Sequence, residues 1–159
     1  MKKNSIYPIF VYLFISISFI LSLQSCEKEN EGCDEENISM AGEDDSHNKG
    51  QNCMQCHVEG GEGDGCFVVA GTVYDSLQLN TVSSGKMEFY TEPNGQGQKI
   101  ETVQIDSKGN FFTTDLFNFQ GLYPAVTGPN GITNYMGSPL SSGQCNSCHG
   151  VSTSRIWVN

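Results

Sequence analysis

The chain has few basic residues and few histidines. Of its 159 residues only 8 are Lys or Arg, against 18 Asp and Glu, which gives a formal net charge of −10. This balance argues against nucleic acid or an anionic membrane surface as a partner. It favours encounter with a partner protein whose docking face is basic, steered by charges whose effect salt would weaken.

The chain after residue 48 also lacks helical periodicity and internal repeats apart from two short motifs described below. Its glycine-rich run at 60–65 does not lie between a strand and a helix, as a phosphate-binding loop would. What it does contain is a series of short β-branched and aromatic segments separated by Gly, Pro and Asn turns. These segments are 67–74, 86–91, 99–106, 111–114, 122–126 and 131–135. The pattern predicts a mainly β fold, a small β-sandwich over 49–159, with loops or short helices at both ends.

Two short stretches of this region resemble known sandwiches. The Ala-Gly-Thr-Val run at 70–73 and the Asp-Ser-Lys-Gly-Asn-Phe turn at 106–111 are similar to the carboxypeptidase-regulatory or transthyretin-like domains of bacterial surface proteins. The resemblance covers about 50 residues. It implies a sandwich of the immunoglobulin-like or transthyretin-like kind.

The N-terminus has the pattern of an export signal over residues 1–25. Lys2 and Lys3 precede an apolar run, and Leu-Gln-Ser-Cys at 23–26 resembles a bacterial lipobox. That resemblance implies cleavage before Cys26 and acylation of its thiol, so that the protein is held by lipid at the periplasmic or outer-surface side of a bacterial membrane. A retained transmembrane anchor and plain secretion are the alternatives, since the apolar run is close to the lower length limit for a span. All three place the mature chain outside the cytoplasm.

Residues 26–48 are predicted to be a disordered acidic tether. Nine of the 18 acidic residues lie between Glu27 and Asp45, in a stretch with little apolar content. Removal of residues 1–25 leaves 18 acidic and 6 basic residues, a formal net charge of −12.

The pentapeptide C-x-x-C-H occurs twice, at 53–57 and at 145–149. This is the spacing by which c-type haem is attached, because the two thiols can add to the two vinyl groups of one porphyrin. The histidine that follows can then bind the iron from the proximal side. The sequence therefore predicts two covalent haem c groups, attached at Cys53, Cys56, Cys145 and Cys148. His57 and His149 are the predicted proximal iron ligands.

This layout, an exported chain with one C-x-x-C-H on each flank of a β domain, resembles diheme c-type cytochrome lipoproteins. The resemblance implies membrane-anchored electron transfer through two haems. The fold departs from small soluble cytochromes c, whose haem is wrapped by helices, so the motifs carry over haem attachment and the proximal ligand but not the architecture.

The remaining cysteines, histidine and methionines supply further candidates. An exported chain would pair Cys33 with Cys66 in a disulfide, and two free thiols are the alternative. His47, six residues before the first motif, and Met136, nine residues before the second, are the candidate distal iron ligands. An exposed loop histidine and a core methionine are the plain alternatives. A His/Met iron has a higher potential than a bis-His iron, so two different distal ligands would make a potential step.

Three rival functions remain open. Two C-x-x-C pairs with two histidines could bind zinc without haem. The sandwich could be the working part of a structural or binding surface lipoprotein. Two unequal haems, one with an open iron, are what a peroxidase-type enzyme needs, but no acid–base set is evident around a distal pocket. The sequence favours an electron carrier over a catalyst.

Overall fold

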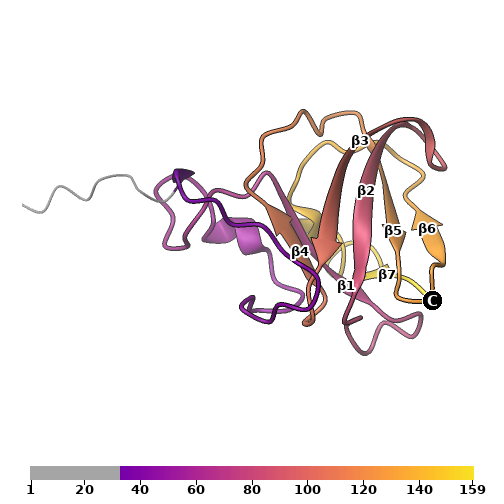
Figure 1. Ribbon diagram of the computed structural model, residues 1–159, viewed down its shortest axis with the longest axis horizontal. Coiled ribbons are helices and arrows are strands. Elements are labelled where there is room, and N and C mark those ends of the chain that lie inside the picture. The colour runs from indigo at the N-terminus through magenta and orange to yellow at the C-terminus, as the bar shows by residue number, and fades with distance from the viewer. Residues whose placement is uncertain (1–32) are drawn as a thin grey trace, which may run out of the picture.

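β-branched and aromatic residues form seven strands in the computed structural model, which describes residues 33–159 (Figure 1). The strands are β1 (Val69–Tyr74), β2 (Gly85–Glu92), β3 (Gln96–Ile105), β4 (Asn110–Thr113), β5 (Tyr123–Thr127), β6 (Thr133–Tyr135) and β7 (Ile156–Trp157). Two short 3-10 helices, η2 (Cys53–Gln55) and η3 (Cys145–Ser147), complete the elements.

The strands make two sheets, with the orders β4-β1-β7 and β3-β2-β5-β6. Every pairing is antiparallel except that of β1 with β7, which is parallel. The prediction of a mainly β fold and a small sandwich is confirmed. Each of the six predicted segments contains a strand, within a few residues of its predicted bounds.

The core lies between the two sheets. Met87 and Phe89 of β2 belong to it and are 3% and 0% exposed. Phe111 of β4 and Ile105 of β3 are fully buried against the same cluster. Strand β1 is buried along its whole length, because it is the middle strand of its sheet and is covered by the core on one face and by the two short helices on the other.

The strand β7 was not predicted from the sequence. It has only two residues, and it pairs Val73 with Ile156 and Tyr74 with Trp157. A two-residue strand has no period to detect. Its effect is to return the chain after the second motif to the edge of β1.

The expected disordered tether at 26–48 differs from the structure where the structure describes it. Ser39 is 1% exposed, its amide donates to the Phe112 carbonyl at 2.9 Å, and its hydroxyl donates to the Gln104 carbonyl at 2.7 Å. Ser39 thereby links β4 and β3, which are edge strands of the two sheets. Further along, the Glu43 carbonyl accepts from the Ser107 amide at 2.8 Å. Residues 33–48 therefore belong to the domain, because these backbone groups find partners that acidic composition does not reveal. The predicted signal segment 1–25 and Cys26 lie outside the described residues.

A disulfide bond also anchors this segment to the rest of the domain. Cys33 and Cys66 are bonded, with their Cα atoms 4.6 Å apart. The pairing matches the one expected for an exported chain.

Replacing Cys33 and Cys66 together by alanine is expected to lower the free energy of unfolding by about 3–4 kcal/mol, because the bond closes a long loop in the unfolded chain. Urea unfolding of the oxidised protein and of the double variant measures the difference. Leu116→Ala, at a side chain 93% exposed, is the control and should leave the midpoint unchanged. An unchanged midpoint in the cysteine variant would show that the segment does not depend on the bond.

Candidate functional site

The two C-x-x-C-H motifs fold into the same local structure. In each, three residues form a 3-10 turn, η2 in the first motif and η3 in the second. The backbone amide of the histidine donates a hydrogen bond to the carbonyl of the first cysteine. The N···O distance is 3.1 Å from His57 to Cys53 and 2.9 Å from His149 to Cys145. Both cysteines and the histidine of each motif are therefore presented from a single turn.

Each motif histidine is held through the same ring nitrogen. His57 Nδ1 donates to the Asp64 carbonyl at 2.8 Å, and His149 Nδ1 donates to the Ser154 carbonyl at 2.8 Å. A carbonyl oxygen only accepts, so Nδ1 carries a proton, and in the neutral imidazole Nε2 is then the nitrogen with the lone pair. A backbone carbonyl on one nitrogen is the usual arrangement that orients a metal-binding histidine through the other.

The first histidine is also fixed by packing. His57 is 8% exposed, and its ring stacks on Phe67 with centroids 4.1 Å apart. Phe67 in turn stacks on Phe112 at 4.8 Å. A Cβ at Gly63 would lie 2.7 Å from the His57 ring, so the glycine is needed for this close approach.

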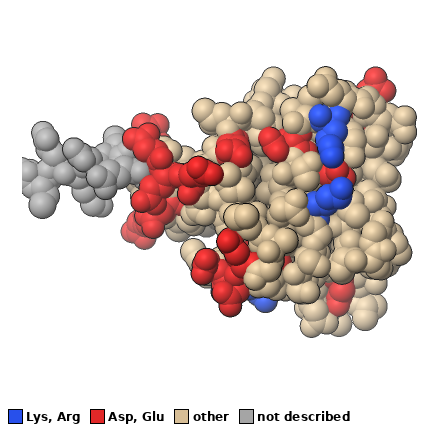
Figure 2. All heavy atoms as spheres, viewed as in Figure 1, with Lys and Arg blue, Asp and Glu red and all other residues tan. Residues whose placement is uncertain are grey.

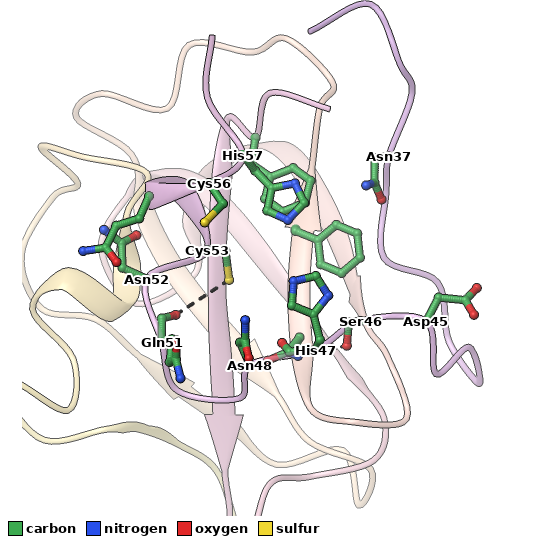
Figure 3. Close-up of a pocket in the computed structure, with 14 residues that line it drawn as sticks. Asn37, Asp45, Ser46, His47, Asn48, Gln51, Asn52, Cys53, Cys56 and His57 are labelled. Carbon is green, nitrogen blue, oxygen red and sulfur yellow. Dashed lines mark hydrogen bonds between the residues drawn. The ribbon is translucent and has the colours of Figure 1, made fainter. Parts of the chain in front are cut away.

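A cavity of about 160 Å³ lies beside the first motif. Cys53, Cys56 and His57 line it, and so does His47. Figure 3 shows the His47 and His57 rings and both sulfur atoms facing this space. The two imidazole centroids are 5.9 Å apart. The structure thus brings His47 to the first motif, the position that a distal ligand of the first haem would require.

A larger cavity of about 620 Å³ lies beside the second motif. Cys145, Cys148 and His149 line part of it, and Met136 lines it as well. Met136 is half-buried and also packs on the core, so both expectations for this side chain are compatible with its position. The volume is within the range typical of small-molecule and cofactor sites, whereas the first cavity is smaller than that range.

The two motifs lie against each other. Asn52 Nδ2 donates to Gln144 Oε1 at 2.9 Å, and Asn146 Nδ2 donates to the Gln51 carbonyl at 2.8 Å. These residues flank Cys53 and Cys145, so segments 92 and 95 residues apart in the chain meet at the two turns.

Burial changes the chemistry of the first cysteine of each motif. It raises the pKa of the Cys145 thiol to about 12, with a further contribution from the charge of a Cys53 thiolate. Burial likewise raises the pKa of Cys53. The second cysteines, Cys56 and Cys148, are exposed. A C-x-x-C pair used for thiol–disulfide exchange depends on a thiolate of lowered pKa, so this arrangement argues against that activity.

Comparison with protein-family models, with curated proteins and with solved structures found no match. The resemblance to diheme c-type cytochrome lipoproteins is therefore wrong as a family assignment. In the described part of the chain no group of three or more His, Cys, Asp or Glu could hold a metal ion, and the disulfide Cys33–Cys66 is no evidence for such a family. The same finding speaks against a zinc site within residues 33–159. Since no solved structure matches, the resemblance to transthyretin-like sandwiches stays a prediction.

Within residues 33–159 no helix is both long enough and apolar enough to cross a membrane.

Several residues that build the site were missed from the sequence. The carbonyls of Asp64 and Ser154 orient the histidines, but any residue has a carbonyl, so no side-chain pattern points to them. Asn146 and Thr72 join the motifs through buried hydrogen bonds. A buried Thr inside a strand and an Asn between two cysteines have no distinguishing spacing.

Alkylation of the haem-free chain is expected to label Cys56 and Cys148 first and Cys145 last. The thiolate is the reactive form, so with a pKa of about 12 the Cys145 rate should rise about tenfold per pH unit from pH 7 to 10. The raised pKa also means that the native state holds this proton longer than the unfolded chain. Stability should therefore fall as pH rises above about 9. Iodoacetamide labelling followed by mass spectrometry measures the rates, and equal rates for Cys145 and Cys148 at pH 8 would contradict the expectation.

Proposed function

We propose that the protein carries electrons through two haem groups, each attached covalently at one C-x-x-C-H motif. Cys53 and Cys56 would form the thioether bonds of the first site, and Cys145 and Cys148 those of the second. His57 and His149 would bind the irons through Nε2. Bound haem would supply one-electron chemistry at iron, which a protein without a redox group lacks.

The observation that carries the proposal is the matched geometry of the two motifs. Each presents two thiols and an imidazole from one turn, and each imidazole has Nδ1 held by a carbonyl and, among the residues from 33 onward, no hydrogen bond at Nε2. The donor set fits a haem held by thioethers and one histidine. The buried Cys145 and the half-buried Cys53 fit as well, because a thioether is uncharged whereas a metal-bound thiolate is not.

Electron carriage is favoured over catalysis by the side chains in the two cavities. His47 lies in the cavity of the first motif and Met136 in that of the second. Each can serve as a sixth ligand, which would leave no coordination position for a substrate. A peroxidase would need one such position open.

The surface around the first motif supports a basic redox partner. Residues 33–66 contain nine acidic residues, all exposed, and a single basic residue, Lys49. In Figure 2 the acidic side chains gather on the side of the molecule that this segment occupies in Figure 1. Opposite charges would steer the encounter, and salt would slow it.

An exported, membrane-held location completes the proposal. It rests on the signal pattern of 1–25 and on Cys26 as the lipid-bearing residue. The disulfide between Cys33 and Cys66 supports an oxidising compartment, the periplasm or the outer surface, where covalent haem attachment also takes place.

Production of the full chain in a bacterial host that matures c-type cytochromes is expected to yield two haems per chain. Intact mass and a pyridine haemochrome assay measure them, and both should survive acid–acetone extraction because the bonds are covalent. Cys53→Ala with Cys56→Ala should leave one haem, as should Cys145→Ala with Cys148→Ala. Cys33→Ala with Cys66→Ala is the matched control and should keep two. A native chain without bound haem would refute the proposal.

A further inference from the structure

One residue between the cysteines of the second motif is buried, although haem attachment places no demand on it. Asn146 is 4% exposed, whereas its counterpart in the first motif, Met54, is half-buried and makes no side-chain hydrogen bond within residues 33–159. The two positions have the same spacing from their cysteines. The difference therefore needs a reason other than the motif itself.

Every polar atom of the Asn146 side chain has a partner. Its Nδ2 donates to the Gln51 carbonyl at 2.8 Å and to Thr72 Oγ1 at 3.0 Å, and its Oδ1 accepts from the Thr72 amide at 3.2 Å. Gln51 lies two residues before Cys53. One side chain thus links the turn that carries Cys145 to the segment that carries Cys53, with β1 as the third point of attachment.

The network continues to the other side of the first cavity. Thr72 Oγ1 accepts from the Gly50 amide at 2.9 Å and donates to Asn110 Oδ1 at 2.6 Å. Asn110 Nδ2 then donates to the His47 carbonyl at 3.2 Å. Buried polar groups that are all satisfied hold one arrangement, because any shift would leave a donor or acceptor without a partner.

We propose that Asn146 is a positioning residue that fixes the second motif against the first, so that the two attachment sites form one rigid unit. The inference rests on the proposed function, since it concerns where two haems would be held. The parallel hydrogen bond between Asn52 and Gln144, at 2.9 Å, supports the same contact from outside the buried network.

The position of the two first cysteines agrees with this role. Asn52 directly precedes Cys53 and Gln144 directly precedes Cys145, so the hydrogen bond between these two side chains holds the first cysteines of the two motifs near each other. Gly71 of β1 leaves room for both Phe111 and Cys145, because a Cβ there would lie 2.6 Å from the Phe111 ring and 3.0 Å from Cys145 Cβ. The distance between Cys53 and Cys145 is therefore a direct measure of how the motifs are held.

The first test uses a full chain that cannot attach haem normally. Cys26, Cys56 and Cys148 are replaced by serine, so that Cys53 and Cys145 are the free thiols, and dibromobimane fluoresces when it bridges them. Asn146→Leu keeps a similar volume but removes all three hydrogen bonds. Because Cys145 is buried and labels slowly, the bridging rate is expressed relative to the rate at which monobromobimane labels Cys145 in the same chain. This relative rate is expected to fall about tenfold, because the loss of three hydrogen bonds frees the turns to separate. Ser147→Ala is the matched control and should bridge at the parent rate, because within residues 33–159 the Ser147 hydroxyl bonds only inside its own turn, to the Gln144 carbonyl and to Cys148 Sγ.

An Asn146→Leu chain that bridges as fast as its parent would overturn the inference. Circular dichroism and the thermal midpoint show whether that variant is folded. If it is not, Gln144→Leu replaces it, since Gln144 is only half-buried and its side chain bonds to Asn52 alone within residues 33–159. An unchanged bridging rate in a folded Gln144→Leu chain would also count against the inference.

The second test uses the chain with all its cysteines, after haem attachment. Paramagnetic resonance of the oxidised parent is expected to show two interacting irons, and Asn146→Leu should weaken that interaction while still carrying two haems. Two haems with an unchanged interaction would overturn the positioning role and leave the proposed function intact. A chain without haem would refute the proposed function, while the bridging rate would still decide the role of Asn146.

Discussion

The buried hydroxyl of Thr72 is the point on which the arrangement of the site depends. It accepts from the Gly50 amide before the first motif, accepts from Asn146 inside the second, and donates to Asn110 on β4. Strand β1 pairs with β7 only at Val73 and Tyr74, so the Thr72 amide is also available and donates to Asn146 Oδ1 at 3.2 Å. Since β1 is buried along its whole length, the residues bonded to it cannot exchange those partners for water without cost.

Burial of one cysteine in each motif follows from the same packing. The turns lie on β1 and on each other, so Cys145 is buried and Cys53 is half-buried, while the following cysteines face solvent. Desolvation disfavours the charged form of a thiol, which makes these two cysteines poor nucleophiles and poor thiolate ligands. A covalent, uncharged thioether avoids that penalty. The electrostatics therefore separate the proposed haem attachment from the metal and dithiol alternatives, which all require a thiolate.

Most of the sandwich could be predicted from the sequence, because β-branched residues and Gly or Asn turns report directly on backbone conformation. The Pro93-Asn94-Gly95 turn is one example, with φ of +60° at Asn94 and +70° at Gly95 between β2 and β3. The two motifs were found for a similar reason, since their spacing is set by local chemistry. The ordered segment around Ser39 was not, because its acidic neighbours dominate the composition, while the hydrogen bonds of Ser39 to β3 and β4 hold the segment. Contacts between distant segments, such as Asn146 with Gln51, leave no pattern in either segment alone.

The two sites differ in their surroundings although their turns are alike. The first has His47 nearby and lies in the acidic segment 33–66. The described residues that line the second cavity include Met136 and Arg155 and no Asp or Glu. Negative charge stabilises an oxidised iron, and a thioether ligand raises the potential relative to a second imidazole. In the proposed function both effects act in the same direction, so the first site would have the lower potential and the second the higher. A rigid contact between the motifs is what would let such a difference be used, because the separation between the two sites would then stay constant while their charges change.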